Sequence, residues 1–307
     1  MMPMLAPIFV ALSMSSQSDV NEALLKAVSH SDLASAQTAL KRGANPNGTS
    51  VARVPLIEAL KLPPRKGTPI VKLLLDKGAD PNRQGSGGVP PLFIASWRNP
   101  EAIKILVERG ADIDSTSKID GWTSLHAAMM DRGTLSRQSV FVLLKLGASP
   151  NIGSCNGKSA LMIAVHALDI KLVHELLRRG ADVNLRTSSM NVARWPEGWS
   201  PLHFAVTPFE EYTEIVRHHS TPEPKNRVKS SKYILMIEIL LRAGADPNLR
   251  DAQGFRPENL LIKAKNEGNH VLSSRIKKAL DLLQARANSL ANTSRNDAAT
   301  TGSATRR

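Results

Sequence analysis

The chain of 307 residues is predicted to fold as an all-α repeat solenoid, and a recurring phrase is the first reason. The phrase is Gly-Ala followed by Asp, Asn or Ser, and it begins at Gly43, Gly78, Gly110, Gly147, Gly180 and Gly244. Neighbouring glycines among the first five lie 32 to 37 residues apart, and the last interval is 64 residues. A period near 33 residues with a helix-ending glycine is the signature of stacked repeats.

Apolar residues ahead of the phrase have the spacing of one helix face, which is the second reason. Before Gly180 they are Leu172, Val173, Leu176 and Leu177. Glycine then supplies the left-handed conformation that ends the helix, and a Pro or Val shortly afterwards keeps it from resuming. One such unit cannot bury its stripe alone. Stacking solves this, because each Leu buried between units contributes about 1.5–3 kcal/mol.

A second phrase marks the start of the first helix in most units. It is written Val54-Pro55-Leu56, Pro90-Pro91-Leu92, Thr123-Ser124-Leu125-His126 and Ser200-Pro201-Leu202-His203. Together the two phrases closely resemble the ankyrin repeat, in which a tight turn starts one helix and a Gly-Ala-Asp hairpin follows the next. The resemblance covers roughly residues 18–285, and it is specific because TPR and HEAT repeats lack this hairpin. It implies about seven ankyrin repeats, each a helix-turn-helix plus a hairpin.

The ends of the array depart from the repeat. The first unit, residues 20–47, lacks a Pro-Leu turn and is interpreted as the N-terminal cap. The last unit, residues 254–285, lacks the Gly-Ala-Asp exit and is interpreted as the C-terminal cap. We therefore expect one solenoid over residues 18–287 instead of the two globular domains that length alone suggests. Residues 288–307 are rich in Ala, Ser, Thr and Asn without an apolar period, which predicts a disordered tail.

Residues 1–17 form an apolar leader with two open interpretations. The stretch from Met4 to Met14 has the length of a signal peptide, and Ala11-Leu12-Ser13 resembles a cleavage site. No Lys or Arg precedes it, and the cap helix is expected to begin near Asp19, which favours a disordered leader. We therefore expect a cytoplasmic or nuclear protein, with secretion as the alternative. No stretch reaches the ~18 apolar residues that a membrane span needs.

The sequence carries no pattern for catalysis or metal binding. Its one cysteine, Cys155, excludes an intramolecular disulfide framework and a Cys-rich zinc site. No GxSxG, HExxH, phosphate-loop or dinucleotide motif is present. His126 and His203 occupy the turn phrase, where the ankyrin family uses the imidazole to hydrogen-bond neighbouring backbone. We predict a non-enzyme with no catalytic residue, no cofactor and no metal.

The resemblance also indicates where a partner would bind. Ankyrin proteins usually bind partners with their hairpin tips and with the exposed face of each first helix. The corresponding positions give predicted partner contacts at Trp97, Arg98, Trp122, Met130, Lys158, His166, Trp199 and Thr207. Trp and Arg are the residues most enriched in binding hot spots. For Trp122 and Trp199 the alternative is that each ring packs on the adjacent hairpin.

The sixth repeat is predicted to have two expanded loops. Its hairpin, between Asn184 and Ser200, is 16 residues long, and the segment between its two helices has 23 residues more than in the fifth repeat. Loops that interrupt a regular array commonly serve binding. A degenerate extra repeat is the alternative explanation of the added length.

Both loops combine residue types that suit an acidic partner. The hairpin carries Arg194 and Trp195, and the interhelix loop is basic and includes Arg227 and Lys229, so these four join the predicted partner contacts. The alternative for the interhelix loop is a solvated spacer, because a run of charge usually is one.

The net charge of +13 favours an acidic partner. Nucleic acid is the weaker choice because no RNA-binding, helix-turn-helix or zinc-finger signature appears. We therefore predict a monomeric interaction module that binds another protein, with an acidic surface, on its concave face. Two alternatives stay open: a substrate-recruiting adaptor of a larger enzyme complex such as a ubiquitin ligase, and a secreted or host-delivered ankyrin protein.

Overall fold

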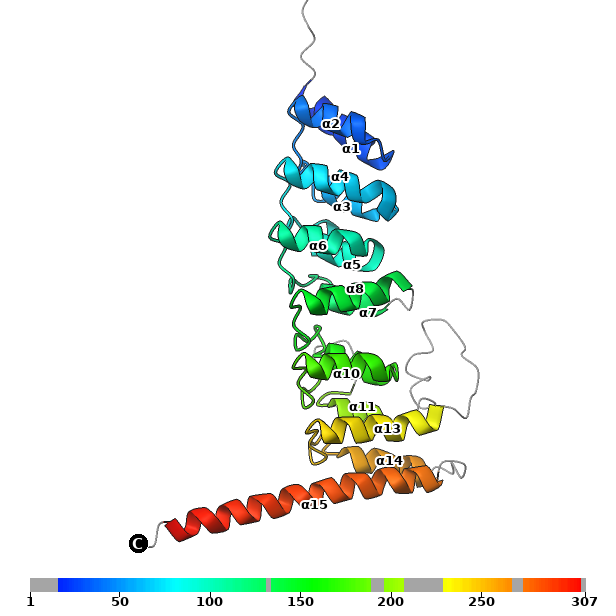
Figure 1. The fold of residues 1–307 in the computed structure, drawn as a ribbon, viewed down its shortest axis with the longest axis vertical. Helices are drawn as coiled ribbons and strands as arrows, with labels where there is room; N and C mark the ends of the chain where they lie inside the picture. Colours follow the sequence, from blue (N-terminus) through cyan, green and yellow to red (C-terminus); the bar gives the residue numbers. More distant parts are fainter. Residues whose placement is uncertain (1–15, 131–133, 189–195, 207–228, 267–272, 305–307) are drawn as a thin grey trace, which may run out of the picture. The chain divides into compact units, whose positions relative to one another are not determined.

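A computed structural model of the chain describes residues 16–130, 134–188, 196–206, 229–266 and 273–304. Every regular element in these ranges is helical, as Figure 1 shows. The residues form two compact units. Unit 1 comprises residues 1–119 and 130–146, and unit 2 comprises residues 120–129 and 147–307. The predicted all-α repeat fold is confirmed.

Unit 1 consists of helix pairs. The helices are α1 (Gln17–Ser29), α2 (Leu33–Lys41), α3 (Pro55–Lys61), α4 (Pro64–Asp76), α5 (Pro91–Arg98), α6 (Pro100–Glu108) and α8 (Thr134–Lys145), with a short 3-10 turn η1 (Ser86–Gly88). Within each repeat the two helices pack side by side, as for α1 with α2 and α3 with α4. First helices also pack on first helices (α1 on α3, α3 on α5) and second helices on second helices (α4 on α6, α6 on α8).

Unit 2 repeats the same arrangement. Its helices are α7 (Ser124–Met130, of which Met130 belongs to unit 1), α9 (Ala160–His166), α10 (Ile170–Arg178), α11 (Pro201–Val206), α13 (Lys229–Arg242), α14 (Pro257–Asn266) and α15 (Ser273–Ala304). Helix α9 packs on α10 and on α11, and α11 packs on α13 and α14. Helix α13 therefore pairs with α11 as the second helix that precedes Gly244.

The helix-ending glycines behave as predicted. All six have positive φ angles, between 79° and 97°. A Cβ atom added at any of them would meet nothing within 4 Å. The requirement for glycine at these positions therefore lies in the backbone conformation and not in space for a neighbour.

The Asn that closes the recurring phrase joins one repeat to the next. In unit 1, the Asn47 side-chain amide donates to the Gly78 carbonyl (3.2 Å), and its Oδ1 accepts from the Asp80 backbone N–H (2.7 Å). In unit 2, Asn151 makes the same pair of bonds with Gly180 and Asp182 (2.9 and 2.8 Å). These bonds satisfy backbone groups at the end of each second helix, which explains why the whole phrase recurs.

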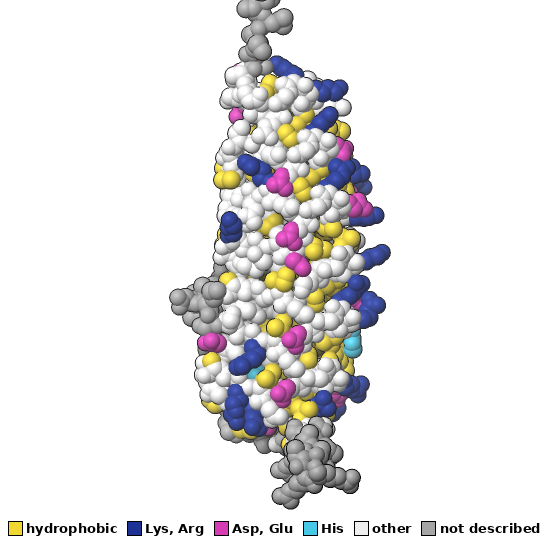
Figure 2. All heavy atoms as spheres, turned by 90° about the vertical axis from the view of Figure 1, so that its left-hand side faces the viewer, with side chains coloured by type: hydrophobic (Ala, Val, Ile, Leu, Met, Phe, Trp, Pro, Cys, Tyr) yellow, Lys and Arg dark blue, Asp and Glu magenta, His cyan; other side chains and the backbone are white. Residues whose placement is uncertain are grey.

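Cationic and acidic side chains are arranged alike in both units on the side where the second helices end. On this face, seen in Figure 2, each unit carries Lys and Arg mainly along one margin and Asp and Glu nearer the middle. Cations in the last turn of a helix are favoured by the helix dipole. The cations in the last turns of second helices, such as Lys41, Lys145 and Arg242, therefore help to stabilise those helices.

The predicted disordered tail from residue 288 differs from the structure. Helix α15 continues to Ala304, and its Ala279 and Leu283 are buried in unit 2. A helix nucleated by this packing extends readily through Ala-containing sequence, because adding a residue to an existing helix costs little. Of the predicted leader, residues 1–17, the first 15 lie outside the described residues, and Ser16 and Gln17 form the N-cap and first residue of α1.

Candidate interaction surfaces

In unit 1, two predicted contact residues form one exposed pair. Trp97 and Arg98 occupy the last turn of α5, and the Trp97 side chain is 45% exposed. The Arg98 guanidinium lies over the Trp97 ring, 5.0 Å from its centroid, in cation–π geometry. Met130, at the end of α7, is also exposed. These three residues are accessible to a partner, as the predicted role requires.

In unit 2, the two tryptophans that precede a turn phrase pack to different degrees. Trp122 is half-buried, with its ring centroid 6.3 Å from that of His126. Trp199 is buried at 6% exposure; its ring stacks on His203 and meets Phe204 edge-on at 5.2 Å. The ring of Trp199 is therefore covered by its own unit, which agrees with the packing alternative, and contact of Trp199 with a partner stays a prediction.

His126 and His203 are structural, as expected from the family. The His126 Nε2–H donates to the Lys158 carbonyl at 2.9 Å, and Nδ1 lies 2.8 Å from the Thr123 hydroxyl. His203 makes the equivalent contacts with Phe255 and Ser200. Each ring thus links its own turn to the next one, and burial lowers the pKa of both imidazoles.

Lys158 and His166 lie half-buried in the repeat between these histidines. The Lys158 ammonium is 5.8 Å from the centroid of the Phe204 ring. Burial against such apolar surroundings lowers the pKa of Lys158 to about 8. Lys158 therefore carries a less strongly held proton than a surface lysine would.

The remaining predicted residues lie outside what the structure describes. Arg194, Trp195, Thr207 and Arg227 fall in undescribed segments, and Lys229 begins α13 without a described side chain. The base of the sixth-repeat hairpin is described. There, Thr187 and Trp199 exchange backbone and hydroxyl hydrogen bonds, including Thr187 N–H to the Trp199 carbonyl at 2.9 Å.

Sequence reasoning did not identify the role of Arg186. Its Nε donates to the Gly198 carbonyl (3.2 Å), and a terminal guanidinium nitrogen donates to the Arg250 carbonyl. Arg186 thereby connects the two sides of the hairpin base and joins them to the following loop. The sequence shows only an Arg within a loop rich in polar residues, and this pattern does not indicate the role of Arg186.

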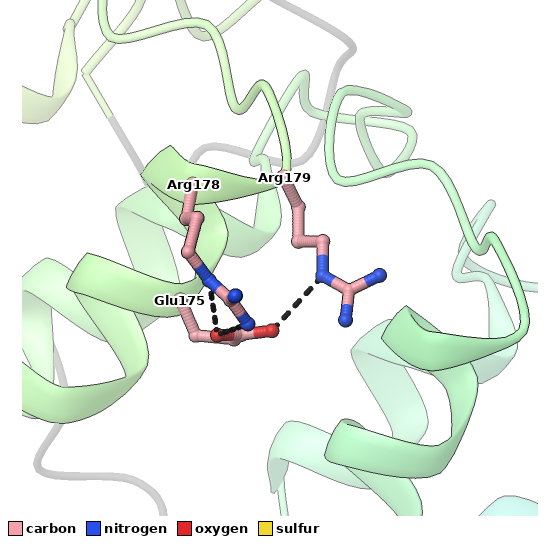
Figure 3. A network of polar contacts seen from close by, with 3 residues as sticks. All are labelled: Glu175, Arg178 and Arg179. Carbon is pink, nitrogen blue, oxygen red and sulfur yellow. Dashed lines mark hydrogen bonds and ion pairs between the residues drawn. The ribbon is translucent and has the colours of Figure 1, made fainter.

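Two arginines at the end of α10 form an ion-pair network with one carboxylate of the same helix. Glu175 Oε2 accepts from Arg178 at 2.6 Å, and Oε1 accepts from Arg179 at 2.9 Å, as drawn in Figure 3. Hydrogen bonds from Arg178 and then Arg179 hold the pKa of the Glu175 carboxyl below its usual range. Both arginines are therefore partly engaged by Glu175 of their own helix.

The described part of the chain contains no group of three or more His, Cys, Asp or Glu side chains that could hold a metal ion. Within the same ranges, no helix is both long and apolar enough to cross a membrane.

The comparison with known families decides which fold family the helix pairs represent. The family described as ankyrin repeats (3 copies) matches residues 24–117 and 92–187, which together cover more than half of the chain. The chain belongs to the ankyrin-repeat family. This agrees with the interrepeat Asn bonds and the turn histidines.

Curated relatives match only parts of the ankyrin array. An ankyrin repeat protein of fowlpox virus is 33% identical over 142 residues, or 45% of this chain and 40% of its own length. An ankyrin repeat-containing protein of Treponema pallidum is 33% identical over 37% of each chain. The transient receptor potential channel pyrexia of Drosophila melanogaster is 37% identical over 36% of this chain and 11% of its own length. The chain thus spans two fifths or less of the curated relatives it matches.

Solved structures support the same fold. The ankyrin repeat domain of Bcl-3 superimposes with a TM-score of 0.60 at 21% identity, covering 85% of this chain and 97% of that domain. An ankyrin repeat domain from Acinetobacter baumannii gives 0.54 at 23% identity, covering 76% and 97%. At these identities the likeness extends to the fold alone.

Proposed function

We propose that this chain is a monomeric, non-enzymatic module that binds an acidic surface of another protein through the exposed faces of its first helices. Ankyrin repeats are in general protein–protein interaction modules, which supports the protein-binding part of the proposal. The net charge of +13 supports the acidic character of the partner. The observation that carries the proposal is the exposed Trp97–Arg98 pair of unit 1.

This pair combines the two residue types most enriched in hot spots. Because the Arg98 guanidinium already stacks on Trp97, part of the entropy cost of ordering both side chains is met before binding. Among the described residues no carboxylate lies within ion-pair distance of Arg98. Its charge is therefore available to an acidic group of a partner.

A matched pair of variants tests the proposal. The partner is first captured with the intact chain and identified, and its dissociation constant is then measured for Trp97→Ala and Phe141→Ala. Phe141 is the control because it is also exposed, at 41%, but lies on the second helix α8. We expect Trp97→Ala to weaken binding by about 2 kcal/mol or more, roughly 30-fold, with the melting temperature unchanged.

Equal losses from both variants would contradict a binding face on the first helices. So would wild-type affinity in Trp97→Ala. Either outcome would assign binding, if it occurs, to another surface.

The sixth-repeat loops are proposed to add specificity. The length and composition of the hairpin support this, as does the way Arg186 fixes its base. We propose that Arg194 and Trp195 contact the partner and that the basic loop with Arg227 and Lys229 attracts it. Affinity of Trp195→Ala for the same partner tests the hairpin, because wild-type affinity would assign it a spacer role. No feature of the described residues favours the adaptor or the secreted alternative.

A further inference from the structure

Most of the positive charge on the helices of unit 1 lies on the second helix of each repeat. With the C-cap residues Arg42, Lys77 and Arg109, the helices α2, α4, α6 and α8 hold ten Lys and Arg and three Asp and Glu. The first helices α1, α3 and α5 hold three of each. The function proposed above uses the first helices and the sixth-repeat loops, so it leaves the cations of the second helices without a role.

These second helices form one continuous side of unit 1. Helix α2 packs on α4, α4 on α6 and α6 on α8, and Figure 1 shows them stacked in this order. All ten cationic side chains are exposed to solvent. We call the exposed side of α2, α4, α6 and α8 the second-helix face.

The helix dipole explains only some of these cations. It favours those at the ends of the helices, such as Lys41 and Lys145. Arg65 and Lys66 lie in the first turn of α4, where the dipole disfavours positive charge and where no acidic residue accompanies them. The stability of α4 therefore does not account for these two residues, whereas an anionic ligand does.

The acidic side chains of this face hold two of the cations only weakly. Asp76 lies 2.6 Å from Arg109, and Glu108 lies 3.6 Å from Lys104. All four side chains are more than two fifths exposed, and ion pairs between exposed side chains contribute little. Both cations can therefore turn to an external anion at small cost.

Aliphatic side chains lie between the cations of the second-helix face. Lys66, Leu73 and Lys77 occupy positions i, i+7 and i+11 of α4 and its C-cap, which fall on the same side of a helix. Ile105 of α6 and Val142 of α8 stand, like Leu73, five residues before a helix-ending glycine. All three aliphatic side chains are half-buried. Because α4 packs on α6 and α6 on α8, they form a row across three helices.

We propose that the second-helix face lies on a membrane surface that contains anionic phospholipids. Its cations contact the phosphate and carboxylate groups of the lipids, and the row of Leu73, Ile105 and Val142 contacts the boundary between headgroups and acyl chains. The first helices, with Trp97 and Arg98, stay available for a protein partner. The proposal adds a second ligand to the function proposed above and does not depend on it.

A lipid surface fits this face better than two other anionic ligands. Nucleic acid offers no apolar surface to the aliphatic row, and single strands bind by stacking on aromatic side chains, of which these helices have Phe141 alone. An acidic protein must place its carboxylates to match fixed cations. Lipid headgroups move within the layer, so they meet cations that are spread over four helices.

Vesicle flotation with the intact chain tests the proposal. The vesicles contain phosphatidylcholine alone or phosphatidylcholine with phosphatidylserine. Wild type is compared with Lys66→Glu plus Lys77→Glu on the second-helix face and with Lys26→Glu plus Lys61→Glu on the first helices α1 and α3. Both double variants lower the net charge by the same amount, and all four lysines are exposed. Melting temperatures check that each protein is folded.

We expect wild type to bind only the vesicles with phosphatidylserine. The second-helix variant should lose about tenfold or more in its partition coefficient, because each cation near an anionic surface adds to the attraction. The first-helix variant should change by about twofold or less, because salt screens charges that lie away from the lipid. Equal losses in both variants would overturn the proposal, since net charge alone would then explain attachment. Equal binding of wild type to both kinds of vesicle, or to neither, would overturn it as well.

Two further ligands separate the proposal from its alternatives. If wild type binds double-stranded DNA more tightly than these vesicles and the second-helix variant loses that binding, nucleic acid occupies the face and the proposal fails. If the second-helix variant loses affinity for the captured protein partner but not for vesicles, a protein occupies the face and the proposal also fails. Lost vesicle binding with wild-type affinity for the captured partner supports the proposal. The Trp97→Ala measurement tests the proposed function separately.

Discussion

At the scale of single residues, tryptophans that look alike in sequence divide by burial. Trp97 lies at the end of a first helix and is exposed, whereas Trp199 precedes a first helix and is enclosed by His203 and Phe204. Both tryptophans were predicted to lie on the binding face, because the family pattern defines the position of a residue within the repeat and not how deeply it is buried. One of the neighbours that cover the ring of Trp199 is Phe204, which lies on α11.

Trp199→Ala should destabilise the chain by about 3 kcal/mol or more, because removing a buried indole leaves a cavity that its neighbours fill only partly. Urea unfolding followed by circular dichroism measures this loss. Trp97→Ala, measured beside it, should leave the unfolding free energy nearly unchanged. Similar stability in the two variants would contradict the burial assignment.

The turn histidines predict a pH dependence of stability. Burial lowers the folded pKa of His126 and His203 below the ordinary imidazole value of 6.5, so the unfolded chain binds protons more readily than the folded one. Stability from these residues is then fully present above about pH 6.5 and is lost as the pH falls through and below that value.

Unfolding free energies at pH 7.5 and pH 5.5 should therefore differ less for His126→Gln with His203→Gln than for wild type. The comparison between proteins removes the contribution of other titrating groups. An equal decrease in both proteins would show that these imidazoles are not the source of acid sensitivity.

At the scale of elements, most of the fold could be predicted. The glycine phrase predicted the helix ends, because the left-handed conformation that ends each helix favours glycine. The apolar stripes predicted the buried faces. The continuation of α15 to Ala304 could not be predicted because its distal part has no apolar stripe and depends on nucleation by Ala279 and Leu283.

Gly147→Val should destabilise unit 2 by about 1 kcal/mol or more, because Gly147 has a φ of 97° and a β-branched residue resists this conformation. No neighbour lies within 4 Å of the added Cβ, so the loss measures backbone strain alone. Gly147→Asn is the control, because Asn tolerates the left-handed region and should recover part of the loss. Thermal unfolding distinguishes wild type and the two variants. Equal midpoint temperatures would contradict the role of Gly147 in ending its helix.

At the scale of the whole molecule, the same physics sets both fold and function. Repeats that bury one face against their neighbours leave loop tips and the ends of some helices exposed, so residues there can vary without loss of the core. In this chain those positions carry Trp97, Arg98, Val51 and Ile119 in unit 1. The sequence located candidate contact residues by their positions in the repeat, whereas their exposure depends on tertiary neighbours, and their contact with a partner stays a prediction.

Hydrogen–deuterium exchange of the intact chain, alone and saturated with its captured partner, tests the central claim most directly. Binding through the first helices predicts slower exchange in residues 84–99, which contain α5 and the loop before it, with little change in the second helices α4 and α6. Protection confined to α4 and α6, with residues 84–99 exchanging as in the free chain, would contradict the account.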